Sequence, residues 1–91
     1  VMVEKDSRRL KLYMKNGEVI RVMGTIKDFL TGLNPLIFVM CHRSFIINLK
    51  YVSRIDKNTV YLCGDKYVAY LSRNRYTSIK EAFINYVEKS I

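Results

Sequence analysis

The sequence lacks the features that membrane, secreted and zinc-binding proteins usually carry. None of its apolar runs reaches the ~18 residues that a membrane-spanning helix needs, and Val1–Asp6 turns charged too soon for a signal peptide. Cys41 and Cys63 are the only cysteines, they form no C-x-x-C pair, and His42 is the only histidine. A disulfide-stapled fold or a zinc site normally uses more such residues. We therefore expect a cytoplasmic protein with two reduced thiols, no metal and no cofactor.

Acidic residues are scarce relative to basic ones. Eight Asp and Glu stand against sixteen Lys and Arg, which gives a formal net charge of +8 on 91 residues. Such an excess raises the affinity for polyanions such as DNA, RNA or anionic lipid, and it speeds the encounter with them. Alternatively, the cations only solvate the surface. The length suits a single domain, residues 1–91, and because the chain opens with Val1 instead of methionine we expect a piece of a longer protein.

Alternation of apolar and polar residues predicts a β-rich fold. The expected strands are residues 1–5, 10–15, 18–23, 36–41, 45–49, 51–55, 60–63 and 67–71. Asn16-Gly17 and Gly64-Asp65 are dipeptides that favour hairpin turns between neighbouring strands. Three polar residues, 42–44, interrupt two apolar strands and predict a turn or a bulge that presents its side chains.

Two segments instead have the periodicity of a helix. Thr25 is a suitable N-cap for a short helix near residues 25–33, which the Gly, Asn and Pro of residues 32–35 would end. An apolar stripe predicts a longer C-terminal helix near residues 75–90. The candidates for its N-cap are Ser72, Asn74, Thr77 and Ser78. The order of elements predicts a mostly-β domain with helices at one edge and at the end.

Three basic segments fall at predicted turns or strand ends: residues 7–9, 42–44 and 72–75. The planar fork of arginine donates two hydrogen bonds to the O6 and N7 edge of guanine in the major groove. Ser and Asn supply short donors that suit phosphate oxygens. Three such turns, held by apolar strands, could span more than one groove of a duplex. The alternative is three solvated turns, because arginine is common at strand ends.

His42 and the tyrosines admit more than one role. His42 could act as a pH switch, a metal ligand or a general base, or it could pack and orient its loop through a hydrogen bond. We favour the packed role, because the sequence offers no second histidine and no acidic partner nearby. Cys41 points to the opposite face of the strand from His42, which disfavours a thiol enzyme. The seven tyrosines could stack on unpaired bases, but such rings more often pack half-buried with the hydroxyl at the rim.

The segment Phe38–Asn48, FVMCHRSFIIN, resembles the signature of the LytTR family, which runs roughly F-x-R-x-H-R-S-[FY]-[LIV]-[VI]-N. Tyr51–Ile55 and Leu71–Arg73 resemble the following strand and the S-R motif near the family's C-terminus, so the resemblance covers essentially the whole chain. Members of the family are DNA-binding output domains of bacterial response regulators. The resemblance implies elongated antiparallel β-sheets whose loops enter two successive major grooves and the minor groove between them, with no recognition helix.

Site residues follow from the resemblance, position by position. Arg8 is expected in one major groove, Arg43 near the central minor groove and Arg73 in the second major groove. Backbone or supporting contacts are expected from Ser7, Arg9, His42, Ser44, Ser72, Asn74 and Arg75. Met40 stands where the family often has arginine, so a neighbouring Lys or Arg must supply any phosphate contact made there. The first loop varies within the family, so Arg9 could replace Arg8 as the base reader.

The sequence thus predicts sequence-specific binding of double-stranded DNA by the output domain of a bacterial transcription regulator, without catalytic residues. The resemblance also implies paired repeats in the target, a dimer on the DNA, and an upstream receiver domain outside this chain, which would then be the C-terminal part of the regulator. Two other functions stay open. One is an RNA or single-strand binder that uses tyrosine platforms, and the other is a protein-interaction module that binds no DNA.

Overall fold

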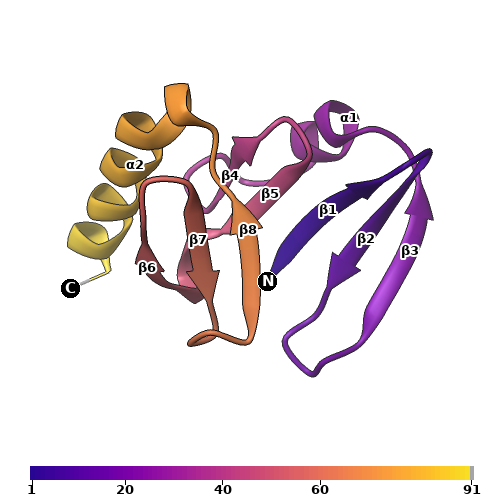
Figure 1. Ribbon diagram of the computed structural model, residues 1–91, viewed down its shortest axis with the longest axis horizontal. Helices are drawn as coiled ribbons and strands as arrows, with labels where there is room; N and C mark the ends of the chain where they lie inside the picture. Colours follow the sequence, from indigo (N-terminus) through magenta and orange to yellow (C-terminus); the bar gives the residue numbers. More distant parts are fainter. Residues whose placement is uncertain (91) are drawn as a thin grey trace.

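A computed structural model describes residues 1–90 and shows two antiparallel β-sheets with two α-helices (Figure 1). The strands are β1 (Met2–Asp6), β2 (Arg9–Tyr13), β3 (Val19–Met23), β4 (Phe38–His42), β5 (Phe45–Asn48), β6 (Val52–Ile55), β7 (Thr59–Leu62) and β8 (Tyr67–Tyr70). The helices are α1 (Ile26–Thr31) and α2 (Tyr76–Lys89), with 3-10 turns η1 (Leu49–Tyr51) and η2 (Arg73–Arg75). The predicted mostly-β class, with a short helix and a C-terminal helix, is confirmed.

The larger sheet has the strand order β3-β2-β1-β5-β4, and the smaller is the meander β6-β7-β8. The N-terminal strand therefore lies inside the larger sheet, paired with β2 on one side and with β5, far along the chain, on the other. The predicted Asn16-Gly17 hairpin joins β2 to β3, and Gly17 adopts a φ of 93°, which glycine reaches without strain. The other predicted hairpin joins β7 to β8.

The larger sheet is the middle layer of the molecule and has a core cluster on each face. Successive residues of β5 point to opposite faces, so Phe45 and Ile47 belong to one cluster and Ile46 to the other. The first cluster includes residues of β7, β8 and α2, and the second lies against α1. In Figure 1, α1 accordingly lies behind the sheet, with β7 and β8 in front and α2 at one side. Burial on both faces explains why β5 reads as a continuous apolar run.

Several predicted strand limits differ from the structure by one or two residues, and three of these differences have a physical reason. The strand expected from residue 36 begins at Phe38, because the carbonyl of Asn34 accepts hydrogen bonds from the amides of Ile37 (3.1 Å) and Phe38 (2.9 Å) and closes a turn. The strand expected at residues 45–49 stops at Asn48, whose side chain accepts from the Lys50 amide at 2.9 Å and starts η1. The first hairpin strand ends at Tyr13, not at residue 15, because the Met14 carbonyl accepts a hydrogen bond of 3.1 Å from the Gly17 amide and closes the hairpin turn.

Of the two predicted helix N-caps, that of α1 is confirmed and that of α2 is wrong. Thr25 caps α1 as expected, since its Oγ1 accepts a hydrogen bond from the Asp28 amide at 3.2 Å. None of the four candidate residues caps α2. The N-cap position of α2 is Arg75, without a side-chain cap, because η2 runs directly into the helix and already supplies its first turn. The basic segment 72–75 is thus a 3-10 turn rather than an open loop.

Candidate nucleic-acid interface

The three basic segments all lie at one edge of the molecule. β1 and β4 both pair antiparallel with β5, so they run in the same direction and their C-terminal ends reach the same edge. The segment after β8 is joined to that edge by a hydrogen bond of 2.9 Å from the Ser72 amide to the Cys41 carbonyl. In Figure 1 the β1–β2 turn, the β4–β5 turn and η2 lie along the upper side. We call this edge, with its exposed Arg8, Arg43 and Arg73, the arginine edge.

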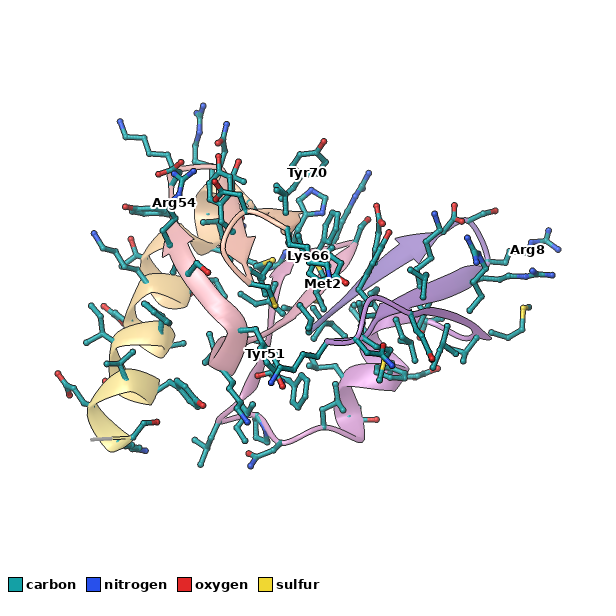
Figure 2. The ribbon with its side chains drawn as sticks, turned by 90° about the horizontal axis from the view of Figure 1, so that it is seen from below. Met2, Arg8, Tyr51, Arg54, Lys66 and Tyr70 are labelled. Atoms are coloured by element: carbon teal, nitrogen blue, oxygen red, sulfur yellow. The ribbon has the colours of Figure 1, made fainter. Side chains whose placement is uncertain are left out.

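The β1–β2 turn carries the first basic segment at the far end of the larger sheet. Asp6 pairs with Arg9 across a two-residue turn, in which Ser7 has a φ of 59°. This tight turn leaves Arg8 at the tip, and Figure 2 shows its side chain extending away from the body of the molecule. Arg9 already belongs to β2 and is exposed as well. The geometry places Arg8 farther out than the strand residue beside it.

The β4–β5 turn carries the second segment and adjoins the first. The Lys5 amide donates to the Ser44 carbonyl at 2.8 Å, which ties the two turns together. Ser7, Arg8 and Arg43 line one surface depression, to which Lys5 and Lys27 also contribute. Sequence reasoning missed these two lysines. The signal for Lys5 was its place next to a basic turn, whereas Lys27 reaches the site only through the packing of α1.

His42 fixes the β4–β5 turn from within the strand. The interruption at residues 42–44 was expected to be a turn or bulge, but His42 is the last residue of β4, where the register with β5 shifts. Its Nδ1 accepts a hydrogen bond of 3.1 Å from the Ser44 amide. The ring packs edge-on against Phe45 and Tyr70, with centroids 5.8 and 6.4 Å away. The packed, turn-orienting role predicted for His42 is confirmed, and Arg43 occupies the tip.

Backbone hydrogen bonds hold the third segment. The Leu71 amide donates to the Asn58 carbonyl, and the Arg75 amide to the Ser72 carbonyl, at 2.9 and 3.0 Å. Arg73 is exposed and shares a depression with Lys57 and Asn58 of the β6–β7 turn. The remaining members of the segment differ in exposure: Asn74 is exposed, and Ser72 and Arg75 are half-buried.

The model of the LytTr DNA-binding domain family matches residues 1–84. The chain belongs to the LytTR family. A solved LytTr DNA-binding domain from Bacillus cereus superposes with a TM-score of 0.71 at 21% identity, covering 91% of this chain and 78% of that one, which supports the fold. A comparison with curated proteins finds no match. The chain is thus a LytTr-type DNA-binding domain, and the arginine edge is its candidate interface.

This LytTR domain departs from the family signature at Met40. Met40 is partly buried and packs with the core cluster of Ile26 and Ile46, on the α1 side of the larger sheet. Lys5 and Lys27 line the depression beside Arg43 at the β4–β5 turn.

The tyrosines mostly follow the expectation for this LytTR domain. Six of them are half-buried, and Tyr70 is the exception at 63% exposed. Tyr70 ends β8 and its ring packs edge-on against Phe45, with centroids 5.6 Å apart. It thereby links the strand that leads to Arg73 with the turn that carries Arg43.

Neither cysteine of the LytTR domain is in a disulfide. Burial raises the pKa of the Cys41 thiol to about 12, so the thiol stays protonated near neutral pH. Its Sγ donates to the Tyr70 carbonyl at 3.2 Å, which is a packing role. Within residues 1–90, no three His, Cys, Asp or Glu side chains gather in a way that could hold a metal ion, and no helix is long and apolar enough to cross a membrane.

Proposed function

We propose that this LytTR domain binds double-stranded DNA sequence-specifically through its arginine edge, with Arg8, Arg43 and Arg73 contacting bases. The observation that carries the proposal is the meeting of three separate basic segments at one edge, through the parallel directions of β1 and β4 and the Ser72–Cys41 hydrogen bond. A backbone-fixed turn positions the Cα of each arginine, which lowers the ordering cost of placing its side chain for the two-pronged contact with a base edge.

The length of the edge supports contact with two major grooves. The longest dimension of the whole molecule is 34 Å, and the arginine edge follows this axis from the β1–β2 turn to η2, short of the far end that α2 occupies. Successive major grooves on one face of B-DNA lie ~34–36 Å apart, so the extended arginine side chains must supply the remaining reach. Along this axis the β1–β2 turn lies at one end, η2 lies towards the other, and the β4–β5 turn lies between them (Figure 1). Arg8 and Arg73 would then enter successive major grooves, with Arg43 over the minor groove between them.

Phosphate and supporting contacts complete the proposal. Ser7, Arg9, Ser44, Ser72 and Asn74 flank the three arginines and would fix the register on the backbone. His42 and Arg75 are half-buried, so they would mainly support the turns that carry the contacting residues. Lys5 and Lys27 add phosphate contacts beside the β4–β5 turn.

Membership of the LytTR family supports a proposal for the wider role. We propose that the domain is the C-terminal output part of a cytoplasmic bacterial transcription regulator, and that an upstream receiver domain promotes a dimer on paired repeats. We assign no enzymatic activity, because the proposed role needs none and the Cys41 thiol is protonated and hydrogen-bonded.

Selection of bound sequences from a random duplex library tests the proposal. A defined consensus with preferences in two blocks about one helical turn apart is expected for each domain. Arg21→Ala, an exposed arginine on β3 away from the edge, serves as the matched control for the edge variants. A library that yields no consensus, or a single-stranded RNA that outcompetes the selected duplex, would overturn the proposal.

A further inference from the structure

A second basic surface lies at the edge opposite the arginine edge. The β2–β3 hairpin turn, η1 and the β7–β8 turn gather there, along the lower side of Figure 1. Figure 2 views the molecule from this side, with Tyr51 and Lys66 labelled near its middle. Three exposed lysines, Lys15, Lys50 and Lys66, come from these three segments, and we call the surface they form the lysine face.

Hydrogen bonds and ring contacts join the three segments into one support. The Tyr67 hydroxyl donates to the Met14 carbonyl at 3.1 Å, and the rings of Tyr67 and Tyr13 lie 5.7 Å apart. The Cys63 amide donates to the Tyr51 carbonyl at 2.9 Å, which fixes η1 against the β7–β8 turn. The lysines are therefore carried by a common scaffold although they are far apart in the sequence.

Each ammonium group lies over a tyrosine ring. Lys15 Nζ and Lys50 Nζ lie 5.9 and 5.7 Å from the centroid of the Tyr51 ring, and Lys66 Nζ lies 5.4 Å from that of Tyr67. Electron-rich ring faces attract ammonium groups and help to hold them in place. The lysine face thus presents three positive charges from a partly ordered array.

Carboxylates of the same region leave these charges uncompensated. In the described part of the chain, ion pairs form only at Lys11 and Arg54. Asp65, in the β7–β8 turn, is one of the Arg54 partners at 3.5 Å, and Glu18 in the hairpin turn pairs with none of the three lysines. The ammonium groups are therefore available to an external anion.

We propose that the lysine face binds an acidic segment of a partner protein while the arginine edge holds DNA. The molecule is at least 23 Å across in every direction, so a duplex on the arginine edge does not reach the opposite side. The lysines also cover the Tyr51 and Tyr67 ring faces, which removes the platforms on which unpaired bases would stack. Flexible lysine ammonium groups act as point charges and suit carboxylates that approach singly, without the two-pronged geometry of arginine.

A titration of the domain with a synthetic acidic peptide tests the proposal. The probe is an acetylated peptide of four Asp-Glu-Gly repeats. Its binding is monitored by amide NMR shifts without DNA, at about 0.1 M ionic strength, where the Debye length is ~10 Å. The largest shifts are expected at Lys15, Tyr51 and Lys66. The variant K15E/K66E should weaken peptide binding by about tenfold, as expected for reversing two charges in direct contact with the peptide.

The matched control is K80E/K89E on α2, which changes the net charge equally. Lys80 also lies over a tyrosine ring, 5.5 Å from the centroid of Tyr76, so the type of contact is matched too. We expect this variant to retain peptide affinity to within about twofold, because distant exposed charges are screened. The two variants should bind the selected duplex equally well, which separates this proposal from that for the arginine edge.

Three results would overturn the proposal. The first is the absence of peptide binding, or an equal loss in both double variants. The second is a set of shifts centred on Arg8, Arg43 and Arg73. The third is a non-cognate duplex that shifts the lysine face at lower concentration than the peptide does, which would assign the face to nucleic acid. None of these bears on sequence-specific binding at the arginine edge, which library selection measures separately.

Discussion

The arginine edge and the lysine face carry the same sign of charge but hold it differently. At the arginine edge, Arg8 and Arg43 occupy short turns between paired strands, and backbone hydrogen bonds fix those turns. At the lysine face, long side chains extend over the rings of Tyr51 and Tyr67. The first arrangement fixes the backbone from which each forked arginine extends, which suits the contact with a base edge, and the second holds point charges over ring faces.

Arg54 is a third kind of cation, because its charge is already paired within the chain. Arg54 is exposed, yet its guanidinium lies 3.6 Å from the centroid of the Tyr61 ring and pairs with Asp56 and Asp65. Its hydrogen-bonding groups are engaged within the chain, so an external anion would have to compete for them. A candidate contact therefore differs from a structural cation in whether its charge is already paired within the chain and in what supports its side chain, not in charge alone.

The largest expected effect is on stability, and it comes from disrupting the core of the larger sheet, whose strands run between the two surfaces. Ile46→Ala removes a fully buried side chain from the middle of β5 and should lower the free energy of unfolding by about 2–5 kcal/mol. Urea denaturation measures this, and Met23→Ala, at a position 69% exposed, should change the free energy by less than about 0.5 kcal/mol. Equal effects of the two substitutions would contradict the core described for β5.

The next effect concerns the reading of bases. Arg73→Ala should weaken binding to the selected duplex by about 1–3 kcal/mol and relax the preference at one base position. Binding isotherms against a set of single-base variants measure both quantities, with Arg21→Ala as the control. If Arg73→Ala retains both affinity and preference, its assignment as a base contact is wrong.

A smaller effect should follow from loosening one arginine turn. His42→Ala removes the acceptor for the Ser44 amide and should weaken DNA binding by about 0.5–1.5 kcal/mol, while peptide binding at the lysine face stays unchanged. His42→Asn can restore an acceptor atom at nearly the same place and should recover part of the loss. Fluorescence anisotropy with a labelled duplex distinguishes the three proteins. A complete absence of change in His42→Ala would exclude the turn-orienting role from DNA binding.

The smallest effect is expected at the lysines beside the arginine edge. Lys27→Ala should weaken binding to all duplexes alike and reduce the slope of log K against log salt by about 0.9. Titrations at several salt concentrations measure this slope. Lys80→Ala, on α2, should leave it unchanged. A Lys27→Ala protein that loses affinity for one sequence only would instead point to a base contact.

Local signals in the sequence predict much of the fold. The Asn16-Gly17 turn, the Thr25 cap and the alternating strands act within a few residues, so they can be read without knowledge of the tertiary structure. The η1 turn was not predicted, because it depends on the Asn48 side chain, which accepts from the Lys50 amide at the end of an otherwise apolar strand. The pairing of β1 with β5 joins distant segments, and no local pattern specifies it.

The candidate site likewise has a part that local sequence predicts and a part that depends on long-range contacts. Each basic segment could be found in the sequence, because arginine, serine and asparagine cluster at predicted turns. Their meeting at one edge depends on long-range pairing and on the hydrogen bond from Ser72 to Cys41, which only the structure provides. The lysine face had no signal at all, since Lys15, Lys50 and Lys66 are single residues in separate turns.

Affinity cleavage tests the central claim most directly. In a Cys63→Ser background, Ser7→Cys and Asn74→Cys place an iron–EDTA group beside Arg8 or Arg73, and each conjugate is bound to a duplex with one selected site. If the three turns of the arginine edge contact one duplex, the two conjugates should give two cleavage centres about 10 bp apart, one from each. Cleavage at the same position from both, or from only one of two conjugates that bind equally well, would contradict a shared duplex.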